Sequence, residues 1–225
     1  MKHTGYLLCI LALVFMLWGF PVMYPLKLLV VFFHESSHAL ATVLTGGRVE
    51  EMVVNSKAGG HVLSQGGNRF VSLNAGYLGS LIWGVVIYTF AASTRMDRPV
   101  MAFLGVVIAL ITLFYVRNLF AILFGLTTAT AMILCARYLN EKINDFILRI
   151  VGLTSMIYVL LDIFDDTISR SHLRSDARML AEEFGGGTIL WGCLWIMISA
   201  VIVASCLRWN LETGSEAKRA DTTRD

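Results

Sequence analysis

Residues 32–40 read Phe-Phe-His-Glu-Ser-Ser-His-Ala-Leu, and this stretch is the strongest indication of the fold and of a functional site. It lies inside an apolar run from Leu26 to Leu44, which is long enough for a helix that crosses a membrane. In a helix, residues four apart lie one above the other on the same face. His34 and His38 therefore present two imidazoles to one point, the spacing that zinc ligation by a helix uses.

Glu35 lies between the two histidines in sequence, about 100° around the helix. That position suits a base that takes a proton from a zinc-bound water, and not a metal ligand. The motif also occurs by chance in soluble helices, but an ionisable group in a membrane-length segment usually has a function. We therefore predict Zn²⁺ as the cofactor, His34 and His38 as ligands and Glu35 as the catalytic residue.

The composition indicates a polytopic membrane protein. Of 225 residues, 56% are hydrophobic and 15% are charged, and the mean hydropathy is +0.69. Soluble domains carry about 25% charged residues. The net charge of +2 leaves no basic footprint for nucleic acid, so no nucleic-acid partner is expected. The cysteines lie scattered through apolar runs without a Cys-x-x-Cys spacing, which indicates packing residues.

Seven apolar segments follow one another along the chain, and several are shorter than the roughly 20 residues that a spanning helix needs. We therefore predict an all-α membrane protein with six or seven transmembrane helices, forming a single domain over residues 1–209. The polar residues 210–225 are predicted to be disordered. The apolar segments cover residues 5–20, 25–45, 70–92, 100–116, 119–135, 146–164 and 188–207.

Residues 48–67 predict a small β-hairpin at the membrane surface, directly after the helix that carries the histidines. Two strand-like runs, 48–54 and 61–65, flank a turn that contains Asn55 and Gly60. The unpaired edge of such a hairpin could receive an extended substrate by strand addition. A plain connecting loop is the alternative interpretation.

A catalytic zinc ion needs a third protein ligand and an open position for water. Counting spans places the end of segment 146–164 on the same side of the membrane as His38. Asp162, near that end, is the carboxylate with the most apolar flanks, and we predict it as the third ligand. Asp165 and Asp166 follow at helical spacing. They could replace Asp162, orient a ligand, or simply cap the helix at the water boundary.

Two further residues are candidates for the site. Glu141 begins an Asn-Glu-x-x-x-Asp pattern over residues 140–145, which soluble zincins use to supply a glutamate ligand, but the span count places it on the opposite side. Asn74 lies in the stretch Asn-Ala-Gly-Tyr-Leu-Gly-Ser at 74–80 and could bond a substrate backbone or the oxyanion. The small residues of that stretch also permit close helix packing.

Taken together, these motifs resemble the site-2 protease family of intramembrane zinc metalloproteases, and most closely its small, peptidase M50B-like branch. The resemblance is carried by residues 33–39, by residues 74–80, and by 161–166 with the Ser-Asp-Ala of 175–177 after them. It implies cleavage of a peptide bond within or beside a transmembrane helix of a membrane-protein substrate. It also implies zinc held by the two histidines and an acidic residue. Better-known members supply that acid from a Leu-Asp-Gly element, where this chain has Leu-Asp-Ile at 161–163.

Two other functional classes stay open: a catalytically silent membrane scaffold or chaperone of the same fold, and a metal transporter. Glu35 favours the enzyme, because neither alternative needs a base at that position. We expect an integral, multi-pass protein of a bacterial inner membrane or a eukaryotic internal membrane, with the lipid bilayer as its surroundings. Because no PDZ-sized insertion is present, a substrate gate would come from the membrane core or from an accessory membrane partner.

Overall fold

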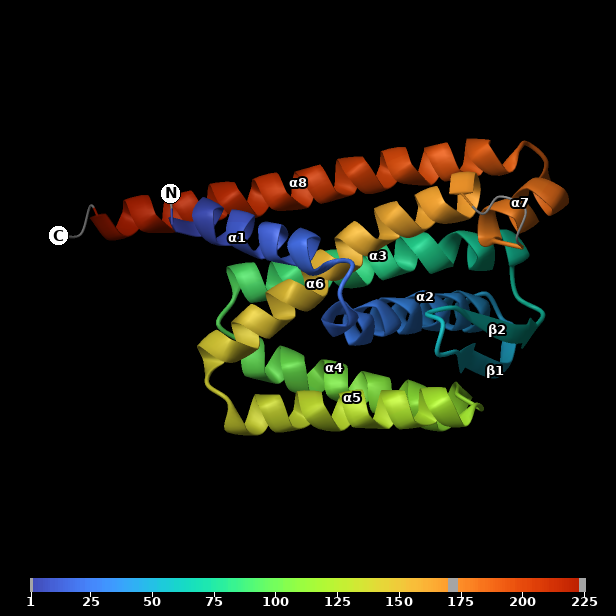
Figure 1. The fold of residues 1–225 in the computed structure, drawn as a ribbon, viewed down its shortest axis with the longest axis horizontal. Helices are drawn as coiled ribbons and strands as arrows, with labels where there is room; N and C mark the ends of the chain where they lie inside the picture. Colours follow the sequence, from blue (N-terminus) through green and yellow to red (C-terminus); the bar gives the residue numbers. More distant parts are fainter. Residues whose placement is uncertain (1, 170–173, 223–225) are drawn as a thin grey trace.

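The computed structural model describes residues 2–169 and 174–222, and most of them are helical (Figure 1). One two-stranded antiparallel sheet interrupts the helices. In chain order the elements are α1 (Lys2–Leu17), the 3₁₀ turn η1 (Pro21–Met23), α2 (Tyr24–Leu44), β1 (Arg48–Val54), β2 (Gly60–Gln65), α3 (Arg69–Ser93), α4 (Asp97–Tyr115), α5 (Leu119–Tyr138), α6 (Glu141–Phe164), the π-helical turn η2 (Asp165–Ser169), α7 (Asp176–Phe184) and α8 (Thr188–Thr222).

Five of the described helices, α3, α4, α5, α6 and α8, are long and apolar enough to cross a membrane. The predicted count of six or seven also included α1 and α2. Both form as helices, but α1 has 16 residues and α2 carries the polar His-Glu-Ser-Ser-His stretch. The prediction of a polytopic, all-α membrane protein is confirmed, with five such spans in the described part of the chain.

The helix with the two histidines lies in the middle of the molecule. In Figure 1, α1 and α8 run along one side and the α4–α5 pair along the other, with α2, α3 and α6 between them. Glycines allow close approach of these central helices, as the small-residue spacing predicts. A Cβ added at Gly84 of α3 would lie 2.9 Å from the carbonyl oxygen of Gly152 in α6, and one added at Gly79 would collide with Ser37 of α2.

The predicted hairpin is present, and it follows α2 along much of its length. At one end, a Cβ added at Gly47 would meet the Gly66 backbone at 2.8 Å, where the chain leaves and re-enters the hairpin. At the other end, the Tyr24 hydroxyl at the start of α2 donates to the Ser56 carbonyl in the turn at 2.6 Å. The hairpin therefore packs alongside α2, the helix that carries His34, Glu35 and His38.

The outer edge of β1 is occupied by the connection between α4 and α5. The side-chain amide of Asn118 donates to the Val54 carbonyl at 2.8 Å and accepts from the Val54 N–H at 3.4 Å. The Arg117 N–H donates to the Met52 carbonyl at 3.3 Å. An apolar environment offers no water to unpaired backbone groups, so these bonds allow β1 to lie deep in the fold.

The disorder of residues 210–225 stays a prediction. The backbone of α8 continues as a helix to Thr222. Extending an existing helix avoids the cost of nucleation, and the segment contains the helix formers Glu, Ala, Lys and Arg.

Candidate metal centre

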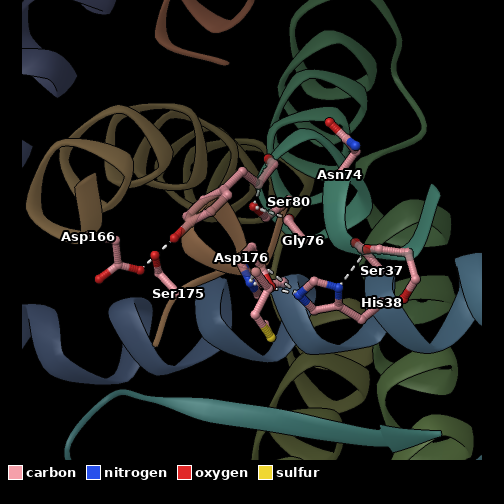
Figure 2. Close-up of polar contacts among 12 residues, drawn as sticks. Ser37, His38, Asn74, Gly76, Ser80, Asp166, Ser175 and Asp176 are labelled. Carbon is pink, nitrogen blue, oxygen red and sulfur yellow. Dashed lines mark hydrogen bonds and ion pairs between the residues drawn. The ribbon is translucent and has the colours of Figure 1, made fainter. Parts of the chain in front are cut away.

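Three side chains direct one potential ligand atom each to a common point. The Nε2 atoms of His34 and His38 are 3.0 Å apart, and each lies 3.1 Å from Oδ2 of Asp176. The side chains are 15%, 11% and 9% exposed, respectively. In residues 2–169 and 174–222, no other group of three His, Cys, Asp or Glu side chains converges in this way. Figure 2 shows His38 and Asp176 facing each other beside Gly76.

The proton arrangement of His38 can be assigned from its neighbour. Nδ1 of His38 lies 2.7 Å from the carbonyl oxygen of Ser72, and a carbonyl only accepts, so Nδ1 carries the hydrogen. In the neutral ring Nε2 then presents a lone pair to the other two ligand atoms. A metal ligand is typically fixed in this way, by a hydrogen bond from its second ring nitrogen.

This geometry fits a divalent cation. A lone pair on His38 and a carboxylate oxygen 3.1 Å away repel each other unless a proton or a cation lies near both. Zinc bond lengths of about 2.0–2.1 Å would place tetrahedral ligands about 3.3 Å apart, close to the observed separations. Two histidines and one carboxylate are a known donor set of catalytic zinc, which leaves one position open.

Gly76 of α3 provides the space beside this point. A Cβ added there would collide with Nε2 of His38 and would lie 2.5 Å from Nε2 of His34. Any larger residue would therefore fill the volume into which the imidazoles point.

Asp176 is the first residue of α7, a short helix outside the five candidate membrane spans. Ser175 caps this helix by accepting from the Arg178 N–H, and Leu180 is fully buried. An ion pair between Arg69 and Glu183 (3.2 Å) attaches the helix to the start of α3. Burial alone would raise the pKa of Asp176. In the metal-free site, where the histidines can take up a proton at Nε2, the His38 charge and hydrogen bonds from both histidines lower this pKa below its usual range. Asp176 therefore stays ionised, as a metal ligand must be.

Glu35 lies next to the cluster but contributes no ligand atom to it. Its side chain is 4% exposed and lies against β2, where a Cβ added at Gly60 would be 2.6 Å from Oε1 of Glu35. The hairpin thus covers the carboxyl group of Glu35 and limits how it can move.

The acid that converges with the two histidines differs from the predicted third ligand. Asp162 lies in the last turn of α6 and is not part of the converging group, whose acid is Asp176. After Phe164 the chain winds as the π-helical turn η2, so the acidic group that reaches the histidines comes from the start of α7. Asp165 is exposed, and Asp166 accepts a hydrogen bond from Tyr77; neither joins the metal group.

Glu141 and Asn74 are also outside the group. Glu141 is exposed in the first turn of α6, at the opposite end of a 24-residue helix from Asp162. Both amide atoms of Asn74 are engaged elsewhere: it donates to the Phe70 carbonyl at 2.8 Å and accepts from the Trp195 indole at 2.9 Å. Figure 2 shows Asn74 directed away from His38 and Asp176.

The sequence includes Asp176 in the stretch 175–177 that carries the family resemblance but gives it no role as a ligand, because its flanks are polar and an apolar setting favoured Asp162. One usable signal was present, a Ser-Asp pair at 175–176 that reads as a helix cap and first residue.

Comparison with known proteins gives one match. A family model described as Peptidase M50B-like matches residues 6–206. No curated protein and no solved structure matches the chain.

Proposed function

The chain belongs to the Peptidase M50B-like family and is an integral, multi-pass membrane protein; from this premise we propose that it is a zinc-dependent endopeptidase. Its substrate is a membrane protein, cut within or next to a transmembrane segment. The observation that carries the proposal is the convergence of His34, His38 and Asp176 directly beside Glu35.

The residues divide the chemistry between them. His34, His38 and Asp176 would hold the zinc, which when bound polarises a carbonyl and lowers the pKa of its bound water towards neutrality. A carboxylate oxygen of Glu35 takes the proton of the attacking water. The same oxygen then returns a proton to the nitrogen of the leaving amine. The Ser72 carbonyl holds the His38 ring in place during both steps.

The hairpin offers a binding edge for an extended substrate. Met52 and Val54 of β1 direct backbone groups to residues 117 and 118, so their partners Val62 and Gly60 direct theirs to the outer edge of β2. No described strand pairs with that edge. A peptide strand added there would be extended and would run past Gly60, which borders Glu35. A substrate helix must unwind before it can be cut, and this edge would hold it unwound.

The substitution Glu35→Gln tests the proposal. The variant should retain zinc, measured by metal analysis of the purified protein, but should no longer cleave a single-span test protein whose transmembrane helix is weakened by Gly and Pro. A metal transporter would still move zinc into vesicles when it carries this substitution, and a silent scaffold would show no cleavage even as wild type. Retention of wild-type cleavage by the variant would contradict the assignment of Glu35 as the base.

A further inference from the structure

The two histidines of the cluster are oriented by different means. His38 is fixed by the hydrogen bond from Nδ1 to the Ser72 carbonyl. Within the described part of the chain, the polar contacts of His34 all run through Nε2, the atom that faces the metal position. The orientation of the His34 ring must therefore come from what packs against it.

Tyr77 of α3 packs against that ring. The centroids of the two rings are 4.8 Å apart and their planes meet at 83°, an edge-to-face contact. Tyr77 is 1% exposed, and its ring also contacts Trp195 of α8, with centroids 4.9 Å apart. Tyr77 thus lies between the first histidine and the last helix.

The hydroxyl of Tyr77 is held as well. It donates to Oδ2 of Asp166 at 2.5 Å, and Asp166 belongs to η2, the turn that follows α6. A hydroxyl bonded to a carboxylate forms a charge-assisted bond, which is stronger than a neutral one. This bond limits the rotation and tilt of the Tyr77 ring and, through the ring, those of His34.

We propose that Tyr77 and Asp166 act together as positioning residues for His34 and so set the metal affinity of the site. This inference rests on the proposed zinc site and adds to it two residues that touch no metal. Packing alone would need only the ring of Tyr77, and phenylalanine would supply it. The hydroxyl and its acceptor are what distinguish positioning from packing.

The test measures zinc affinity of the full-length protein in detergent by competition with a chromophoric chelator. Tyr77→Phe keeps the ring and removes only the hydroxyl, and Asp166→Asn weakens the acceptor. Each should lower zinc affinity about 10-fold, the lower end of the effect of partners that orient ligands. The zinc affinity of the double variant should be no lower than that of either single variant, because both changes remove the same hydrogen bond.

Two matched controls accompany these variants. Tyr88→Phe changes another buried tyrosine of α3, which lies beside Arg149 and away from the histidines. Asp165→Asn changes the exposed neighbour of Asp166. Both should bind zinc as wild type does. The melting temperature of each metal-free variant is compared with that of metal-free wild type, and it should change little for Tyr77→Phe.

Wild-type zinc affinity in both Tyr77→Phe and Asp166→Asn would overturn the inference while leaving the metal site intact. Additive losses in the double variant, or an equal loss in Tyr88→Phe, would overturn it as well, because the effect would then be general loosening of α3. If Tyr77→Phe does not fold, Asp166→Asn tests the same bond from the other side. Failure of the wild type itself to bind zinc would contradict the proposed function first, and so separates the two.

Discussion

Glu35 of α2 and Gly60 of β2 approach so closely that no side chain fits between them. A Cβ at Gly60 would lie 2.6 Å from Oε1 of Glu35 and 2.6 Å from the carbonyl oxygen of Val53. The first contact involves the carboxyl group that we assign as the base, and the second involves backbone that cannot give way easily. The carboxyl group of Glu35 can therefore occupy its observed position only because residue 60 has no side chain.

Gly60→Ala should reduce cleavage of the test protein about 100-fold, because a displacement of about 1 Å at a catalytic group costs that much. Zinc content should be unchanged, since Gly60 does not touch the ligands. Gly59→Ala is the matched control: its Cβ would meet only the Asn55 side chain, at 3.4 Å. Equal activity of the two variants would show that the Glu35–Gly60 contact is not important.

Gly76→Ala should abolish zinc binding rather than alter cleavage alone. The added methyl group would occupy the space between the Nε2 atoms of His34 and His38. We expect zinc affinity to fall about 100-fold or more, measured by chelator competition. Gly79→Ala, one turn along α3, would press on Ser37 instead and should lower thermal stability more than zinc affinity. Stoichiometric zinc in Gly76→Ala would place the metal elsewhere.

Asp176→Ala and Asp162→Ala should separate the two candidate acids. Removing Asp176 takes away one of three ligand atoms, so purified protein should contain almost no zinc. Removing Asp162 should leave the zinc content close to that of wild type. The reverse result would restore Asp162 as the ligand and would contradict the arrangement described here.

Asn118→Ala should destabilise the hairpin. The side chain pairs with both backbone groups of Val54, and their loss leaves a donor and an acceptor of β1 without partners. We expect a cost of about 1–3 kcal/mol in the free energy of unfolding, followed in a denaturant titration in detergent. Hydrogen exchange at the Val54 amide should become faster. Asn118→Asp keeps an acceptor for the Val54 N–H but turns a carboxylate oxygen towards the Val54 carbonyl, so it should cost at least as much as Asn118→Ala.

Much of the helical framework could be predicted from the sequence because apolar runs and their breaks are local signals. The predicted segment 70–92 corresponds to α3, Arg69–Ser93, and 119–135 to α5, Leu119–Tyr138. The glycine pairs at 46–47 and 66–67 are breaks of the same local kind, and the structure has positive φ angles at Gly46, Gly66 and Gly67, at the two ends of the hairpin.

The acid that converges with the histidines could not be found in the same way, because its place depends on how the chain turns after α6. Span counting assumes that a helix ends at the membrane boundary and that the nearest acid faces inward. The turn η2 and the docking of α7 through the Arg69–Glu183 pair are tertiary features with no local signature. The hydrogen bond that the Asn74 side chain accepts likewise comes from a residue 121 positions away, Trp195.

The distance along the chain between His34 and Asp176, 142 positions, has a consequence for biosynthesis. While the protein is being made, both histidines are synthesised long before the ribosome reaches the acid that converges with them. A nascent chain therefore holds only two of the three converging side chains until most of the protein has been translated. If these three side chains hold the catalytic metal, as we propose, the protein cannot cut neighbouring nascent helices, its own included, before it is fully synthesised.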